Sequence, residues 1–163
     1  MHKPMKKAER ELEREEALKI LQSAAYGTLA TIGENGYPYT VVLNHVVVDG
    51  KICFHCAPDG AKISNINQNP KVCFSAVGEV EVLPSSFATA YESAVAFGQA
   101  KKAKPEREAK ILLALIEKFA PEYLEKGAAY INRAAERVAV YEIEIDHLTG
   151  KKCPKPEKQE HKK

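Results

Sequence analysis

Long apolar runs, a secretory leader and an excess of one charge are all missing from this sequence, and each absence excludes a class of protein. No segment approaches the roughly 18 consecutive apolar residues that a membrane-spanning helix needs, and residues 1–16 lack the apolar region of a secretory signal. The 24 basic residues are balanced by 22 acidic ones, which leaves a net charge of +2 and no general footprint for nucleic acid. We therefore expect a cytoplasmic protein that binds neither a membrane nor nucleic acid.

The usual signatures of self-contained catalysis are missing as well. The sequence has no GxGxxG or phosphate-binding GxxxxGK[ST] loop, no GxSxG nucleophile motif, no HExxH motif and no paired carboxylates in apolar surroundings. The chain is nevertheless 163 residues long and 45% hydrophobic, enough for one domain with a core that needs no metal or disulfide. A protein with such a core and no nucleophile often uses a bound cofactor.

Cysteine is scarce, and the four thiols are expected to be reduced in the cytoplasm. Cys53 and Cys56 form a CxxC pair that could be read as a metal or thiol-redox motif. On an extended strand, however, residues three apart point to opposite faces, which suits neither a shared metal nor a disulfide. A thiol or metal protein therefore stays open only as a minor alternative.

The hydrophobic pattern predicts an α+β protein, mainly β, with six antiparallel strands in hairpin order and helices between them. The expected strands are residues 26–32, 38–48, 51–56, 71–82, 92–101 and 138–146. The expected helices are residues 6–24, 61–68 and 105–119, with a further short one within 121–137. The apolar residues of 111–119 cover more than one stripe, so this helix should pack on two sides. Residues 1–24 should pack as an N-terminal helix on a barrel domain of residues 25–149, and residues 150–163 should be a disordered basic tail.

One segment favours an anion. Gly60 and Lys62 lie at the start of the predicted helix 61–68, where free backbone amides and the helix dipole attract a phosphate. Asp59 offers a simpler explanation, in which it caps the helix and Lys62 is merely solvated. His45 and His55 lie near the ends of neighbouring strands, and from the residues alone both are more often structural than chemical.

Eight segments, in this order and spacing, resemble the FMN-binding split-barrel superfamily, which is also called pyridoxamine 5'-phosphate oxidase-like. The segments are 26–31 (YGTLAT), 36–39 (GYPY), 42–45 (VLNH), 52–57 (ICFHCA), 60–63 (GAKI), 69–72 (NPKV), 93–100 (SAVAFGQA) and 141–146 (YEIEID). Within the superfamily the chain is most similar to the Nim-type branch, named for 5-nitroimidazole resistance. The resemblance covers about residues 26–149 and implies a six-stranded antiparallel split β-barrel with flanking helices.

The resemblance also implies a homodimer with two FMN molecules held between the subunits. Carried over by position, Lys62 would bind the phosphate, and His55 and Cys56 would lie beside the phosphate and the ring. Ser93, with Tyr91, would approach the ring from the partner subunit. The residues that would line the ribityl chain and the ring are Val41, Val42, Leu43, Asn44 and His45. With this context the phosphate interpretation of Gly60 and Lys62 is preferred.

Three departures bear on the substrate. Nim-type sequences tend to have proline where this chain has Val42, and an aromatic residue where it has His45. The basic, tryptophan-containing C-terminal motif of true pyridoxamine phosphate oxidases is not recognisable, and this chain has no tryptophan. Pyridoxine metabolism is therefore disfavoured.

The function that follows is an FMN-dependent, nitroreductase-like oxidoreductase. It would pass electrons from a reduced partner or nicotinamide cofactor to a small acceptor such as a nitro-aromatic or a quinone, with His55 as the candidate catalytic residue. The alternative is a non-enzymatic flavin carrier or sensor, or a haem protein with His45 and His55 as axial ligands.

Overall fold

The computed structural model describes residues 3–134 and 137–155. Eight strands are found in these two ranges: β1 (Glu11–Leu12), β2 (Gly27–Ile32), β3 (Pro38–Leu43), β4 (Val46–Val48), β5 (Lys51–Cys56), β6 (Lys71–Leu83), β7 (Ala88–Lys102) and β8 (Ala139–Cys153). The helices are α1 (Arg14–Ser23), α2 (Ala61–Gln68), α3 (Pro105–Phe119) and α4 (Leu124–Ala134), with 3-10 turns at Ala8–Arg10, Pro84–Ser86 and Pro121–Tyr123. Within these ranges no helix is both long and apolar enough to span a membrane.

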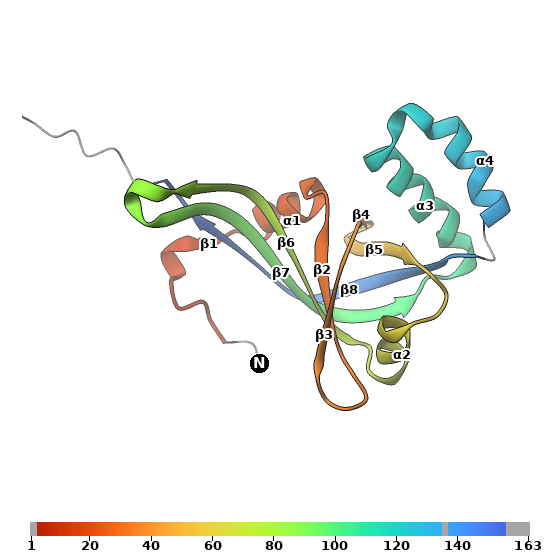
Figure 1. The fold of residues 1–163 in the computed structure, drawn as a ribbon, viewed down its shortest axis with the longest axis horizontal. Helices are drawn as coiled ribbons and strands as arrows, with labels where there is room; N and C mark the ends of the chain where they lie inside the picture. Colours follow the sequence, from red (N-terminus) through yellow and green to blue (C-terminus); the bar gives the residue numbers. More distant parts are fainter. Residues whose placement is uncertain (1–2, 135–136, 156–163) are drawn as a thin grey trace, which may run out of the picture.

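The strands form one antiparallel sheet in the order β3-β2-β6-β7-β8-β5-β4, with β1 added to β8. The consecutive strands β3 and β4 thus lie at opposite edges, although only Asn44 and His45 separate them in the chain. The sheet must curl until its edges meet, and Figure 1 shows this curl around α1. The expected split barrel is therefore confirmed.

The number of strands differs from the expected six. Residues 38–48 were expected to form one strand, but the chain leaves one sheet edge at Asn44 and joins the other at Val46, so the segment forms β3 and β4. β1 is the other addition, since Glu11 and Leu12 pair with Lys151 and Gly150 of β8. The first difference arises because the two halves of the segment join different hairpins, β3 with β2 and β4 with β5, and the second because β1 pairs with a strand distant in sequence.

Two apolar cores hold the fold. The larger one fills the barrel with residues such as Leu29, Phe54, Phe74 and Ile143, and α1 closes it with Leu21. The smaller core packs α3 on the outside of the barrel. Its fully or nearly buried members are Val46, Val48, Cys53, Ala103, Ile111, Leu115 and Val140. β5 and β8 are therefore covered on both faces where α3 crosses them.

Helices α2 and α3 begin and end where the sequence predicts, because local signals set both. Pro105 occupies the first turn of α3. The N-terminal helix is shorter than the expected 6–24, since its capping box joins Glu13 and Glu16 and starts α1 at Arg14. Residues 121–137 contain the 3-10 turn and α4, although positions 135 and 136 lie outside the described residues.

Beyond the residues that pair with β2, β6 and β7 continue as a long hairpin that extends away from the barrel (Figure 1). This hairpin, residues 77–93, is called the arm. β7 begins at Ala88, ahead of the strand expected at 92–101, so its first residues belong to the arm. β8 continues along it to Cys153, which pairs with Tyr91. Residues 150–153, expected at the start of a disordered tail, are therefore strand because β7 supplies their hydrogen-bond ladder, and residues 156–163 lie outside the described part.

Candidate functional site

The loop between β5 and α2 presents unpaired backbone donors. Gly60 is the residue that precedes α2, and its φ of 106° is one that glycine adopts without strain. The first amides with a backbone acceptor are those of Ile63 and Ser64, which both donate to the Gly60 carbonyl. No side chain caps the helix, so Asp59 does not play the capping role that would explain its position more simply. The amides of Ala61 and Lys62 at the helix start thus remain suited to an anion.

Lys62 adds a positive charge beside these amides. It is half-buried, and within residues 3–134 and 137–155 it forms no ion pair. Its ammonium lies close enough to Cys56 to oppose the rise in the pKa of that thiol, which burial causes. Lys62 and Cys56 thus lie near one another, and the ammonium with the free amides suits a terminal phosphate.

The crossover between β3 and β4 is fastened to the end of α1 by three side chains. Asn44 Nδ2 donates to the Ala25 carbonyl over 2.8 Å. His45 Nε2 donates to the Leu21 carbonyl over 2.6 Å. Lys118 Nζ of α3 donates to the carbonyls of Ala24 and His45 over 2.8 and 3.0 Å. The carbonyls of Leu21, Ala24 and Ala25 lie at or just beyond the end of α1, where backbone carbonyls lack intrahelical partners, and the His45 carbonyl belongs to the crossover itself.

His45 belongs to the core and not to a ligand surface. It is 0% exposed, and its ring meets Phe74 edge-on with centroids 4.8 Å apart. Burial and the nearby Lys118 charge lower the pKa of His45 to about 4, so the imidazole is neutral. The expectation that His45 lines a flavin is therefore not met by its side chain, because the crossover carries the residue through the inside of the curled sheet.

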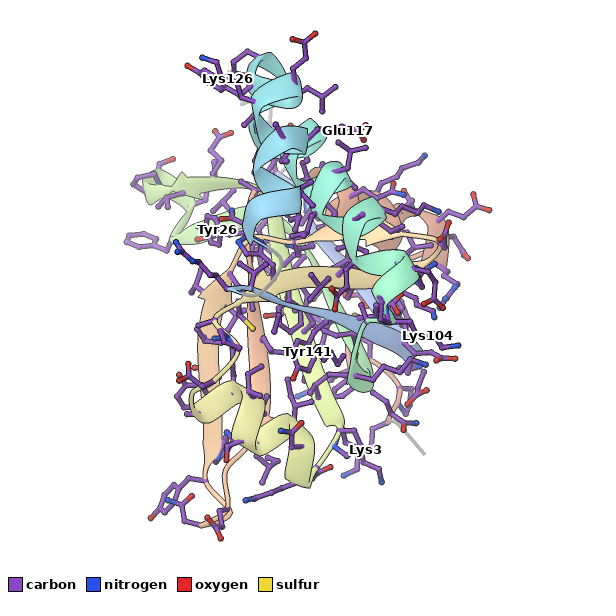
Figure 2. All side chains as sticks on the ribbon, turned by 90° about the vertical axis from the view of Figure 1, so that its right-hand side faces the viewer. Lys3, Tyr26, Lys104, Glu117, Lys126 and Tyr141 are labelled. Carbon is purple, nitrogen blue, oxygen red and sulfur yellow. The ribbon has the colours of Figure 1, made fainter. Side chains whose placement is uncertain are left out.

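An apolar cavity of about 280 Å³ lies where α3 and α4 cover the end of β5. Figure 2 looks on to this side and shows α3, labelled at Glu117, beside α4, labelled at Lys126, above the strands. The described residues that line the cavity are Asn44, His55, Leu112, Leu115, Ile116, Phe119, Ala120, Ile131 and Val138. Two residues predicted from sequence, Asn44 and His55, are thus brought together here.

The alternation along β5 separates His55 from its neighbours. Phe54 and Cys56 pack toward the barrel core, whereas Cys53 and His55 face the α3 side. Partial burial lowers the pKa of His55, so the imidazole is neutral near pH 7. Burial and the charge of Glu142 raise the pKa of Cys53 to about 12, which leaves a protonated thiol. Cys53 and Cys56 therefore do not share a site, and the described residues hold no cluster of three or more metal-ligating side chains.

The remaining predicted residues lie on other surfaces. Val41 and Leu43 pack against the barrel core, and Val42 between them is exposed on the opposite face. Tyr91 and Ser93 lie on the hairpin arm, where they pair with Val80 and Val77 of β6. In Figure 1 the hairpin end of the arm and α2 lie on opposite sides of the molecule.

Lys118 is the main residue that sequence reasoning missed. It follows Glu117 near the end of an apolar stretch of α3, and the sequence alone does not show that its ammonium meets buried carbonyls. The apolar excess of α3 has a cause within the chain: Ile111 and Leu115 pack on the barrel, while Ile116 packs closely on Gly127 of α4. The prediction that α3 packs on two sides is therefore confirmed.

Comparison with known proteins identifies the family. A family model described as pyridoxamine 5'-phosphate oxidase matches residues 13–152, and the chain belongs to this family. This result confirms the superfamily that the sequence motifs indicate. No curated protein matches the chain significantly.

Solved structures share the fold at low sequence identity. A conserved hypothetical protein from Mycobacterium tuberculosis is 19% identical, with 91% of this chain and 90% of that chain covered and a TM-score of 0.78. A putative 5-nitroimidazole antibiotic resistance protein from Bacteroides thetaiotaomicron is 19% identical, with 86% and 85% covered and a TM-score of 0.70. A FAD- and haem-binding protein from Mycobacterium smegmatis is 20% identical, with 86% and 71% covered and a TM-score of 0.69. At these identities the likeness is one of fold.

Proposed function

We propose that this protein is a flavin-dependent oxidoreductase that binds FMN and reduces a small acceptor such as a nitro-aromatic or a quinone. The observation that carries the proposal is the anion site at the start of α2, where free amides follow Gly60 and Lys62 has no acidic partner among the described residues. This donor set suits a terminal phosphate. Two findings support the proposal that the cofactor is a flavin. The chain belongs to the pyridoxamine 5'-phosphate oxidase family, and the similar structure from Mycobacterium smegmatis is named as a FAD- and haem-binding protein.

The residues of this chain would bind and orient the cofactor. When bound, FMN supplies the electron-transfer chemistry at its ring, and a reduced partner or nicotinamide cofactor supplies the electrons. Lys62 and the first α2 amides would hold the phosphate, with Cys56 beside them. Asn44 and His55 would lie beside the ring end, where both line the apolar cavity. Because burial lowers the pKa of His55, we assign it hydrogen bonding and not proton donation near pH 7.

A second copy of the chain would complete the site. Tyr91 and Ser93 lie on the arm, whose hairpin end and α2 lie on opposite sides of the molecule, so they would reach a flavin held by the partner. The outer face of the sheet formed by β3, β2, β6 and β7 carries the exposed apolar side chains of Val42, Val77 and Phe97, which the strand register puts on one side. We therefore propose a homodimer with flavin at its interface.

The haem alternative is weaker on geometric grounds. It needs His45 and His55 as an axial pair, but His45 is fully buried and its Nε2 is engaged by the Leu21 carbonyl. An absorbance spectrum separates the alternatives, since flavin and haem have different visible bands. A Soret band without flavin bands would contradict the proposal.

The phosphate site is tested by titrating the protein with FMN and with riboflavin, which lacks the phosphate. FMN should bind more tightly, and Lys62→Ala should weaken FMN binding by about 1.5–3 kcal/mol, the range for hydrogen bonds to charged groups. Lys71→Ala, a change at an exposed lysine just beyond α2, is the matched control and should leave the affinity unchanged. Equal affinities for FMN and riboflavin would overturn the assignment.

A further inference from the structure

We propose that the cavity between β5 and the α3–α4 pair binds one small, neutral, aromatic molecule of one or two rings, and that this molecule is the electron acceptor. Its binding follows from the cavity itself, whereas its role as acceptor rests on the proposed flavin chemistry.

The size limits the ligand. The cavity measures about 280 Å³. An apolar cavity of about 150 Å³ in a protein interior stays dry and binds benzene. The cavity found here therefore has room for a ligand of naphthalene or naphthoquinone size, and it is too small to enclose an entire flavin nucleotide.

The walls favour an apolar ring. Leu112, Leu115 and Ile116 form the α3 side of the cavity, and Ile131 and Val138 line it from α4 and the start of β8. Phe119 is only partly covered, at 38% exposure, so part of its ring remains available for an aromatic contact. Covering such apolar surface is favourable, and an aromatic pair adds a directional preference.

The cavity offers no charge to a ligand. No described lining residue is acidic or basic, apart from His55, which is neutral near pH 7. The Lys118 ammonium lies 5.1 Å from the centroid of the Phe119 ring, but it donates its hydrogen bonds to the carbonyls of Ala24 and His45. An anionic ligand would lose its hydration and find no cation among the lining residues, so the site favours neutral molecules.

The polar residues would orient the ligand. Asn44 and His55 are the only lining residues with polar side chains in the described part of the chain. One amide hydrogen of Asn44 is used by the Ala25 carbonyl, which leaves the other hydrogen and the His55 imidazole for oxygens of a nitro group or a quinone. These two residues also belong to the proposed flavin site, so a ligand held by them would lie next to the flavin ring.

The experiment fills the cavity without removing a core side chain. Ala120→Phe places a ring in the cavity, and Ala109→Phe, at an exposed position of α3, which ends just before Ala120, is the matched control. The probe is 2-naphthol, which is neutral at pH 7 and does not accept electrons, and its binding is followed by fluorescence titration. Wild-type and Ala109→Phe should bind 2-naphthol with the same Kd. Ala120→Phe should raise this Kd at least about tenfold, which corresponds to RT ln 10 in binding free energy.

Two further measurements make the result decisive. Thermal unfolding verifies that Ala120→Phe is folded, and the smaller Ala120→Leu replaces it if it is not. Naphthalene-2-sulfonate should bind more weakly than 2-naphthol by at least about tenfold, because it carries an uncompensated charge. The cavity assignment would be overturned if the folded Ala120 variant bound 2-naphthol as tightly as the wild type. It would also be overturned if naphthalene-2-sulfonate bound as tightly as 2-naphthol.

Flavin binding is measured separately, so the two proposals can fail independently. With FMN loaded, Ala120→Phe should raise the KM for 1,4-naphthoquinone and leave the FMN content unchanged. Binding of 2-naphthol by a protein that takes up no flavin would refute the acceptor role and retain the cavity. An unchanged KM in a variant that has lost 2-naphthol binding would show that the acceptor reacts elsewhere.

Discussion

His45 precedes β4 and His55 lies near the end of the neighbouring strand β5, yet one side chain is buried and the other is exposed. His45 occupies the β3–β4 crossover, where it is fully buried and hydrogen-bonded to α1. His55 ends β5 with its side chain toward an apolar cavity and with part of its surface exposed. In sequence both are histidines at strand ends, so the path of the chain decides which one is structural and which one can meet a ligand.

The largest expected contrast is in stability. Replacing His45 with alanine removes a ring that packs on Phe74 and should lower the free energy of unfolding by about 3 kcal/mol, as for other large-to-small changes in cores. His55→Ala should cost less than about 1 kcal/mol, because the side chain faces a cavity and solvent. Denaturant unfolding of the two variants measures both costs. Equal losses would remove the distinction between the two histidines.

Acid should reveal the same contrast. The pKa of His45 is about 4 in the folded protein, against a usual value of 6.5. Between these values the unfolded chain binds more protons, so stability falls as the pH falls from 6.5 toward 4, by about 2 kcal/mol at pH 5. His45→Leu should remove most of this pH dependence, whereas His55→Gln should retain most of it. Unfolding curves at pH 7.5 and 5 test this expectation, and an unchanged slope in His45→Leu would contradict it.

Lys118 sharpens the comparison because it holds the crossover that buries His45. Lys118→Met should lower the free energy of unfolding by about 1.5 kcal/mol, the low end for hydrogen bonds to a charged group, since the side chain is only half-buried. The variant should also raise the pKa of His45, because the Lys118 charge contributes to lowering it. A histidine NMR titration measures that pKa, and an unmoved value would show that the charge has no effect on His45.

The smallest expected effect concerns His55 in the proposed reaction. If His55 only hydrogen-bonds, His55→Gln should weaken flavin or acceptor binding by about fivefold, the size of one neutral hydrogen bond, and leave the saturated turnover nearly unchanged. Steady-state kinetics with excess FMN and 1,4-naphthoquinone give both quantities. A fall of about 10²–10⁴ in saturated turnover would instead make His55 a proton donor and reverse the assignment.

Much of the fold could be predicted because local signals carry it. Gly60 and Asn69-Pro70 bound α2, and Pro105 starts α3, so both helices have the expected limits. The extension of β8 to Cys153 could not be predicted, since polar residues 150–153 are strand only because the arm of β7 pairs with them. The break in the segment 38–48 likewise depends on which sheet edges its two halves join.

For the candidate site, the sequence by itself determined which residue types and motifs are present: Gly60 with Lys62 at a helix start, His55 at a strand end, and the family to which they point. Only the tertiary structure decided that His45 lies in the core, that Lys118 fastens the crossover, and that Asn44 and His55 share an apolar cavity with α3 and α4. The reason is physical. A helix start is encoded by neighbouring residues, whereas burial and cavities arise where segments far apart in the chain pack against one another.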